Sequence, residues 1–359
     1  MADQGTSMTT FKKLLVSKQN QVLVLTFDGS QLVVTGRYIQ EDWLPSWCIV
    51  FKRPNFLYTL YIDKAVLVNS ARGSKGGVYL EFNANQTRMV QACFFSDMID
   101  IWDVSAADGN PKLMKSLSIP GKPGLGHKQH HPHQAVLDPT KRFFVVPNLG
   151  SDTLLVLDSK DDAFEIVNMQ AIPPLVGNHV GPRHVAFLTN LEKHYLVLVS
   201  EFTSELFLFE ALYVENGIQF KELQRQPTYS GEPSKVNSHP AQVQVSRNQR
   251  DVYISNLDTD DGTDNIAHYA FQTLSGAPRL HYVGKVSSGG SQPRSFCLSR
   301  DTEQKYIFIS NETGRLGIQV LQRDPTTGTI DPTPVATMLN EDLIVPESQG
   351  QGPHFICEI

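Results

Sequence analysis

In His-Pro-His-Gln-Ala-Val-Leu (131–137), a Pro stands shortly before a short apolar stretch. A turn and a second apolar stretch follow this segment. Four further copies of this phrase, hereafter the Pro phrase, follow along the chain: Gly-Pro-Arg-His-Val-Ala-Phe (181–187), His-Pro-Ala-Gln-Val-Gln-Val (239–245), Gln-Pro-Arg-Ser-Phe-Cys-Leu (292–298) and Gly-Pro-His-Phe-Ile-Cys (352–357). Successive prolines are separated by 50, 58, 53 and 60 residues. This is the period of a four-stranded propeller blade with insertions in its loops. The repeat therefore predicts the fold before any chemistry is considered.

Strand patterns recur through the whole chain. Short β-branched or aromatic runs, bounded by Gly, Pro, Asn, Asp and Ser, stand for example at 21–27, 143–146, 195–199 and 306–309. No sustained 3.6-residue periodicity is present, so helices are not expected. We predict an all-β chain that forms a seven-bladed β-propeller of four-stranded antiparallel blades.

The number of blades follows from the Pro phrases and the chain ends. Five blades start from Pro132 onward, and the 87 residues from Pro45 to Pro132 fit two more. The last phrase leaves only one strand before the chain ends, so residues 11–35 are expected to supply the other three and to close the ring. We expect one domain over residues 1–359, with residues 1–10 disordered.

Composition limits the classes of partner. The formal charge is −6, from 31 basic and 37 acidic residues, and the basic residues are scattered, so nucleic acid is not expected as a partner. No apolar stretch reaches the roughly 18 residues that span a membrane, and no secretory signal is evident. We expect a cytoplasmic protein that acts on a small molecule, in an oligomeric state that the sequence leaves open. The four cysteines lie in or beside apolar runs and are expected to be free thiols.

The Pro phrase also predicts a site, because the entrances of the innermost strands face one mouth of a propeller's channel. The residue after the Pro is His133, Arg183, Ala241, Arg294 or His354. An Arg at this place can hold a carboxylate or phosphate with two parallel hydrogen bonds.

A polar elbow follows each Pro phrase by about 16 to 18 residues and should lie near the same mouth. Glu201 stands in the elbow of the Arg183 blade, and Glu312 stands at the matching position in the Arg294 blade. Glu201 is open to two interpretations, as a structural partner of Arg183 or as a catalytic carboxylate. The parallel favours structural pairing for at least one of the two glutamates.

Four histidines fall within residues 127–133. A metal site is one interpretation, because imidazole is a common ligand of transition metals. No carboxylate or second His pair stands at a recognisable ligand spacing, so we expect no metal and assign His133 to the channel mouth. A structural hydrogen bond to a neighbouring blade is the alternative for His133. No nucleophilic-serine or nucleotide-binding motif is present, and no cofactor is expected.

The chain from about residue 130 onward resembles the lactonase family of seven-bladed propellers. The resemblance rests on the segments 133–152, 181–187, 292–296 and 350–353, in this order and spacing. The family includes bacterial propeller-type 6-phosphogluconolactonases and fungal 3-carboxy-cis,cis-muconate lactonizing enzymes.

The resemblance implies a site that works without a metal. The catalytic His, Arg and Glu of the lactonizing branch correspond to His133, Arg183 and Glu201. A second Arg of that branch would fall within 236–240, where this chain has none, and Arg294 and His239 are the two candidates to replace its charge. His354 and His131 complete the expected substrate-binding residues.

Three functions remain open from the sequence. The first is a lactonase or lactonizing enzyme that opens or closes a ring in a carboxylate-bearing substrate by acid–base chemistry. The second is a cyclase of fungal-type secondary metabolism on the same scaffold, and the third is a non-catalytic propeller that binds proteins. Trp43, Trp47 and Trp102 either form an apolar pocket for a bulkier substrate or pack between blades.

Overall fold

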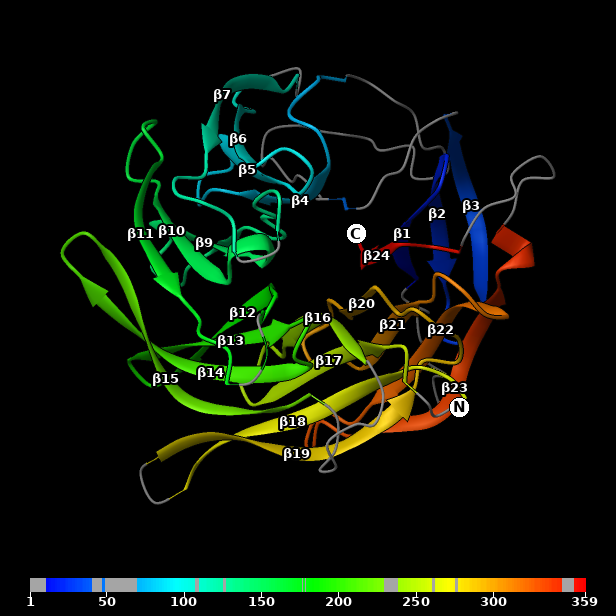
Figure 1. Ribbon diagram of the computed structural model, residues 1–359. Helices are drawn as coiled ribbons and strands as arrows, with labels where there is room; N and C mark the ends of the chain where they lie inside the picture. The colour runs from blue at the N-terminus through cyan, green and yellow to red at the C-terminus, as the bar shows by residue number, and fades with distance from the viewer. Residues whose placement is uncertain are drawn as a thin grey trace, which may run out of the picture.

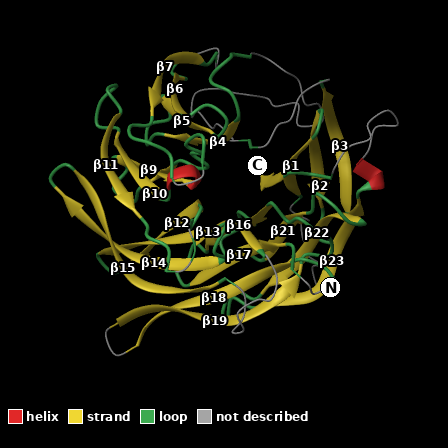
Figure 2. Ribbon diagram, viewed as in Figure 1, coloured by secondary structure: helices red, strands yellow, loops and turns green. Residues whose placement is uncertain are grey.

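In the computed structural model, the described residues form six four-stranded antiparallel sheets around a common centre (Figure 1). The structure describes residues 11–40, 47–48, 70–106, 110–124, 127–175, 177, 179–228, 238–259, 262–274, 277–343 and 352–359. Strands make up nearly all the regular structure in these ranges, with two single-turn 3-10 helices (Figure 2). The chain is an all-β propeller with four-stranded blades, as the repeat predicts.

In every sheet the strands are hydrogen-bonded in chain order, except that the last strand of the chain precedes the first. The N-terminal sheets are β24 (Phe355–Glu358), β1 (Lys12–Lys18), β2 (Gln21–Phe27) and β3 (Leu32–Ile39), then β4 (Gly77–Phe82), β5 (Arg88–Cys93), β6 (Met98–Asp103) and β7 (Lys112–Ser118). The middle sheets are β8 (Val136–Leu137), β9 (Phe143–Asn148), β10 (Thr153–Asp158) and β11 (Glu165–Ala171), then β12 (Pro182–Asn190), β13 (Lys193–Ser200), β14 (Glu205–Val214) and β15 (Gly217–Pro227). The last two are β16 (His239–Val245), β17 (Asp251–Leu257), β18 (Asn265–Leu274) and β19 (Ala277–Ser287), then β20 (Ser295–Leu298), β21 (Tyr306–Ser310), β22 (Leu316–Arg323) and β23 (Ile330–Leu339). The 3-10 turns are η1 (Leu149–Ser151) and η2 (Glu341–Leu343).

Each Pro phrase leads into the first strand of its sheet. These strands are β8, β12, β16, β20 and β24, and in Figure 1 the labels β12, β16, β20 and β24 each lie nearer the centre than the other labels of their sheets. The next strands are the most apolar, and every residue of β9 and β17 is buried. The outer strand β7 alternates between partly buried and exposed positions, because only one of its faces meets a neighbouring blade. The core therefore lies between blades, and the inner strands present their entrances to the centre.

The C-terminal strand pairs with the N-terminal strands, as expected from the single strand that follows Pro353. Strand β24 lies antiparallel to β1, with Ser17 opposite Phe355 and Leu14 opposite Glu358. Ile356 is buried in one apolar cluster with residues of β1, β2, β21 and β22. Full closure of the ring stays a prediction, because residues 49–69 lie outside the described residues.

The described residues contain six of the seven expected blades. The blade that Pro45 is expected to open lies largely within residues 41–69, of which only 47–48 are described. The second blade expected before Pro132 is present as β4 to β7. The expectation for residues 1–10 also lies outside the described residues.

Glutamines two residues after the Pro tie neighbouring blades together. The side-chain oxygen of Gln134 accepts a hydrogen bond from the Val185 backbone N–H at 2.6 Å, and Gln242 accepts one from Phe296 at 2.9 Å. These buried bonds fix the position of one inner strand against the next. The residue after each Pro is thereby held at the centre of the ring.

The structure bears on two further expectations, that the cysteines are free thiols and that the chain does not span a membrane. All four cysteines are free, and Cys93 and Cys297 are buried. Within the described ranges, no helix has the length and apolar character needed to span a membrane.

Candidate functional site

A cavity of about 760 Å³ lies where the inner strands begin. Six of the seven predicted site residues line it: His133, Arg183, Glu201, His239, Arg294 and His354. They come from five different sheets or their elbows, so the ring brings together residues that are as far as 221 positions apart in the sequence. The seventh, His131, is not among the described lining residues.

A repeated backbone hydrogen bond places each elbow beside its Pro phrase. The N–H of Glu201 donates to the carbonyl of Gly181 at 2.8 Å, and the N–H of Glu312 donates to the carbonyl of Gln292 at 3.0 Å. Leu149 makes the same bond in the first of these blades, to the carbonyl of His131 at 3.0 Å. The second elbow residue therefore lies close to the residue after the Pro. Where that residue is Arg, the elbow supplies Glu.

Arg183 and Glu201 form the first ion pair. The Arg183 Nε donates to Glu201 Oε2 at 2.8 Å, and one terminal nitrogen donates to the Ala241 carbonyl in the next blade. The Arg183 side chain is only 7% exposed, whereas that of Glu201 is 31% exposed. Burial lowers the pKa of Arg183, and the ion pair with Glu201 opposes this effect. This pair presents a carboxylate to the cavity.

Arg294 and Glu312 form the second ion pair, which has the opposite burial. The Arg294 Nε donates to Glu312 Oε2, and His354 Nδ1 lies 3.5 Å from the same oxygen. Here the Arg294 side chain is 46% exposed and the Glu312 side chain only 7%. Burial would raise the pKa of Glu312, but His354 and Arg294 together lower it below its ordinary value. This pair presents a guanidinium to the cavity.

Two neighbouring imidazoles, His133 and His184, lie beside Arg183. Their ring centroids are 5.1 Å apart, and Nδ1 of each ring is buried without a hydrogen-bond partner in the described structure. Burial is the main cause that lowers the pKa of each ring well below its ordinary value, and the charge of Arg183 lowers it further. Both rings are therefore neutral at pH 7.

His184 joins the site because of an irregularity that the sequence does not reveal. Strict alternation along a strand would place Arg183 and His184 on opposite faces. The pairing of β12 with β13 shifts register between Pro182 and His184, as at a β-bulge. Both side chains consequently line the cavity.

The His239 ring is held in place by the backbone of Glu201, the elbow residue that pairs with Arg183. Its Nδ1–H donates to the backbone carbonyl of Glu201 at 2.9 Å. Since a carbonyl can only accept, the proton of a neutral His239 ring lies on Nδ1, and Nε2 is its acceptor nitrogen. His239 is thus a described lining residue with a fixed ring.

Aromatic side chains line the side of the cavity that belongs to the N-terminal blades. Trp47, Phe94 and Phe95 are lining residues, and Trp47 stacks on Tyr79 with ring centroids 4.1 Å apart. Trp47 therefore lines the cavity and also packs against rings of two neighbouring sheets, Tyr79 and Phe355. Trp102 is instead buried in an apolar cluster between strands, and Trp43 lies outside the described residues. Sequence reasoning missed Phe94 and Phe95, because no Pro phrase precedes them.

His131 lies behind the aromatic wall. Its ring stacks on Phe94 at a centroid distance of 4.4 Å, and Nδ1 donates to the Phe94 carbonyl at 2.8 Å. It supports a lining residue and is not itself one. Nearby, His127 and His179 have ring centroids 4.5 Å apart. In the part of the chain that is described, no three His, Cys, Asp or Glu side chains are placed to hold a metal ion.

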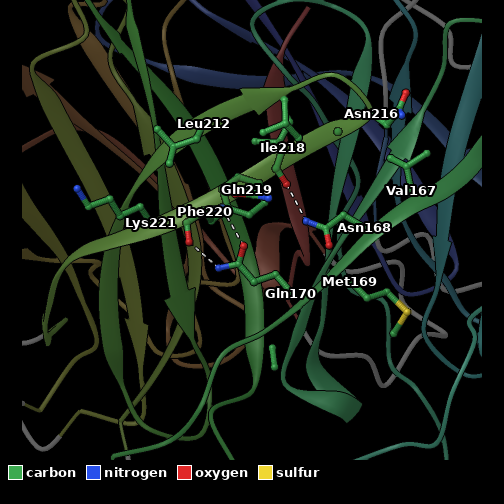
Figure 3. Close-up of a pocket in the computed structure, with 13 residues that line it drawn as sticks. Val167, Asn168, Met169, Gln170, Leu212, Asn216, Ile218, Gln219, Phe220 and Lys221 are labelled. Atoms are coloured by element: carbon green, nitrogen blue, oxygen red, sulfur yellow. Dashed lines mark hydrogen bonds between the residues drawn. The ribbon is translucent and has the colours of Figure 1, made fainter.

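A second hollow, of about 580 Å³, lies between the outer strands β11 and β15 (Figure 3). Asn168 and Gln170 bridge the two strands: Asn168 donates to the Ile218 carbonyl at 2.8 Å, and Gln170 bonds both the N–H and the carbonyl of Phe220. Lys221 is the single ionisable residue among its described lining residues. These amide side chains satisfy backbone groups of β15, and among the described lining residues Lys221 alone could take part in acid–base chemistry.

The chain belongs to the lactonase family of seven-bladed β-propellers. The family model described as "Lactonase, 7-bladed beta-propeller" matches residues 52–345. The family expected from the Pro phrases is therefore confirmed, and the match begins well before residue 130.

The similar proteins are distant. A protein named "Probable 6-phosphogluconolactonase" from Arthroderma benhamiae is 25% identical over 348 residues, which cover 90% of this chain and 84% of the relative. An uncharacterized protein of Staphylococcus saprophyticus is 26% identical over 270 residues, covering 74% and 73% respectively. The solved structure of a periplasmic gluconolactonase from Pseudomonas aeruginosa aligns with a TM-score of 0.65 at 15% identity, covering 98% of this chain and 99% of that one. At that identity, the structural likeness indicates a shared fold.

Proposed function

We propose that this propeller hydrolyses a lactone ring at the cavity by acid–base chemistry. The observation that carries the proposal is the convergence of His133, Arg183 and Glu201, which are distant in sequence, in one cavity. A cavity that encloses a buried guanidinium and two neutral imidazoles supports an enzyme over a protein-binding platform. Membership of the lactonase family supports the choice of reaction.

Each group has a role that follows from its exposure. Glu201, the open member of its pair, takes a proton from the attacking water, while the neutral ring of His133 relays a proton to the ring oxygen. The second terminal nitrogen of Arg183 makes no hydrogen bond in the described structure and can stabilise negative charge on the carbonyl oxygen. Arg294 binds a carboxylate of the substrate with its exposed terminal nitrogens.

The reaction balances without a further reagent. Water forms a new bond to the carbonyl carbon and loses one proton to Glu201. The bond between that carbon and the ring oxygen breaks, and the ring oxygen takes the ring proton of His133, which the proton held on Glu201 then replaces through water. One water and one lactone give one hydroxy acid.

A panel of lactones tests the proposal with the full chain, by pH-stat at pH 7 after dialysis against EDTA. We expect turnover above the uncatalysed rate, retained after dialysis, and a loss of about 100-fold or more in His133→Ala. His194→Ala is the matched control, because His194 lies at the opposite end of its blade and bonds Thr189. Absence of turnover on every lactone, or an active His133→Ala, would contradict the proposal.

A further inference from the structure

The charges that line the cavity compensate one another. Arg183 and Arg294 are each paired with their own glutamate, and Asp258 adds a negative charge at the lip, where the Gln292 side chain donates to it. The described wall thus holds two positive charges against three negative ones. This count covers the Arg, Asp and Glu side chains; of the four lining imidazoles, His133 and His184 add no charge at pH 7, because burial and Arg183 keep their pKa values well below the ordinary value, and His354 is taken up by its contact with Glu312.

A doubly charged phosphate needs a surplus of positive charge at its site. Phosphate sites in proteins supply Arg or Lys side chains or the N–H groups of a helix N-terminus. Arg294 is the exposed guanidinium among the described lining residues, and its Nε is already bound to Glu312. Its remaining nitrogens suit one carboxylate and leave a phosphate dianion largely uncompensated.

The other side of the cavity is apolar and held in place. Trp47 is fixed by Tyr79 and by Phe355, whose ring centroid lies 4.6 Å away. Phe94 is fixed by His131, and Phe95 stands at the lip with 61% of its surface exposed. Covering exposed aromatic surface at the mouth of a cavity with an apolar group of a ligand is favourable, because it removes apolar surface from water.

We infer that the substrate is an amphipathic lactone, uncharged or with a single carboxylate, whose aromatic or other apolar part lies against Trp47, Phe94 and Phe95. A phosphorylated sugar lactone does not fit these walls. The inference rests on the proposed function for the reaction, but its content is the chemical class that the cavity binds. A cavity of about 760 Å³ is large enough for such a molecule.

Binding of unreactive products separates this inference from the proposed reaction. Isothermal titration at pH 7 compares 3-(2-hydroxyphenyl)propanoate, the product of the aromatic lactone dihydrocoumarin, with 6-phosphogluconate. We expect the aromatic acid to bind at least about tenfold more tightly. Tighter binding of 6-phosphogluconate overturns the inference and leaves the reaction standing. If the aromatic acid binds more tightly but no lactone is hydrolysed, the inference is supported and the proposed reaction is contradicted.

Two variants test the two walls. Phe95→Ala should weaken binding of the aromatic acid about tenfold, whereas Phe11→Ala, with a similar exposure of 63% but outside the cavity, should not.

Glu312→Gln should free the charge of Arg294 and tighten binding of 6-phosphogluconate about tenfold. If thermal melting shows that Glu312→Gln does not fold, Asp258→Asn at the exposed lip makes the same test with an expected gain of about threefold. No change in Phe95→Ala, or no gain from the charge variant, contradicts the inference.

Discussion

The two Arg–Glu pairs of this propeller occupy the same place in two blades and present opposite charges. In both, the Arg follows the Pro and its Nε bonds a glutamate that stands 18 residues later in the elbow. In the first pair, Arg183 is buried and Glu201 is open to the cavity, whereas in the second Glu312 is buried and Arg294 is open. A repeated motif therefore does not imply a repeated function.

The neighbouring blade accounts for the difference. Arg183 reaches the carbonyl of Ala241, the small residue that follows the Pro in the next blade, and becomes buried there. In the second pair, the corresponding neighbour is His354, whose ring lies against Glu312 and covers the carboxylate. The residue after one Pro thus differs between the two cases in the way that matches which member of the preceding pair is exposed.

Removal of the buried guanidinium should have the largest effect on turnover. Arg183→Ala is expected to lower kcat by about 1000-fold, because it removes charge stabilisation and frees Glu201 from its position. The fold should persist at a cost of about 1–3 kcal/mol, since the Ala241 carbonyl loses its partner. The pKa of His133 should also rise toward its ordinary value, which NMR titration of the ring can follow. Activity like that of the wild type would remove Arg183 from the site.

Neutralisation of the open carboxylate should have the next largest effect. Glu201→Gln keeps the shape and a hydrogen-bond acceptor for Arg183 but cannot take a proton. We expect kcat to fall by about 100-fold with KM little changed, measured on the best lactone of the panel. An unchanged kcat would make Glu201 a structural partner only.

Removal of the open guanidinium should affect binding. Arg294→Ala is expected to raise KM for a carboxylate-bearing lactone about tenfold and to leave kcat nearly unchanged. A lactone without a carboxylate is the control substrate, and its KM should not respond. An equal rise for both substrates would argue against recognition of the carboxylate.

The buried carboxylate should contribute to stability in a pH-dependent way. Since His354 and Arg294 hold the pKa of Glu312 below its ordinary value of 4.5, the carboxylate stabilises the fold above about pH 4.5. That contribution is lost as the pH falls through the folded-state pKa. Glu312→Gln should cost about 1–2 kcal/mol of unfolding free energy at pH 7 and progressively less below pH 4.5. A difference that is independent of pH, measured by denaturant titration, would contradict the ion pair.

Much of the fold could be predicted from the sequence because each Pro phrase encodes one local event, the entry into an inner strand. Strands β12, β16 and β20 begin within or just after their phrases, and β24 pairs with β1 as the short C-terminal segment requires. The blade expected at Pro45 has no described counterpart to compare, since residues 49–69 lie outside the described ranges.

The candidate site could be predicted only where the repeat itself supplies the residue. His133, Arg183 and Arg294 follow from their position after the Pro, and the structure places all three on the cavity. His184 depends on a register shift, and Phe94 and Phe95 depend on a blade without the phrase, so periodicity could not find them. His131 and His239 both directly precede their Pro, yet His131 lies behind Phe94 whereas His239 lines the cavity, so the position within the phrase does not by itself predict which histidine reaches the site.

Steady-state kinetics of Glu201→Gln and Arg294→Ala on the same carboxylate-bearing lactone tests the central comparison most directly. If the two pairs present opposite charges for different tasks, Glu201→Gln lowers kcat and Arg294→Ala raises KM. If both variants change the same constant to the same extent, the two pairs act alike, which would contradict different tasks for Glu201 and Arg294.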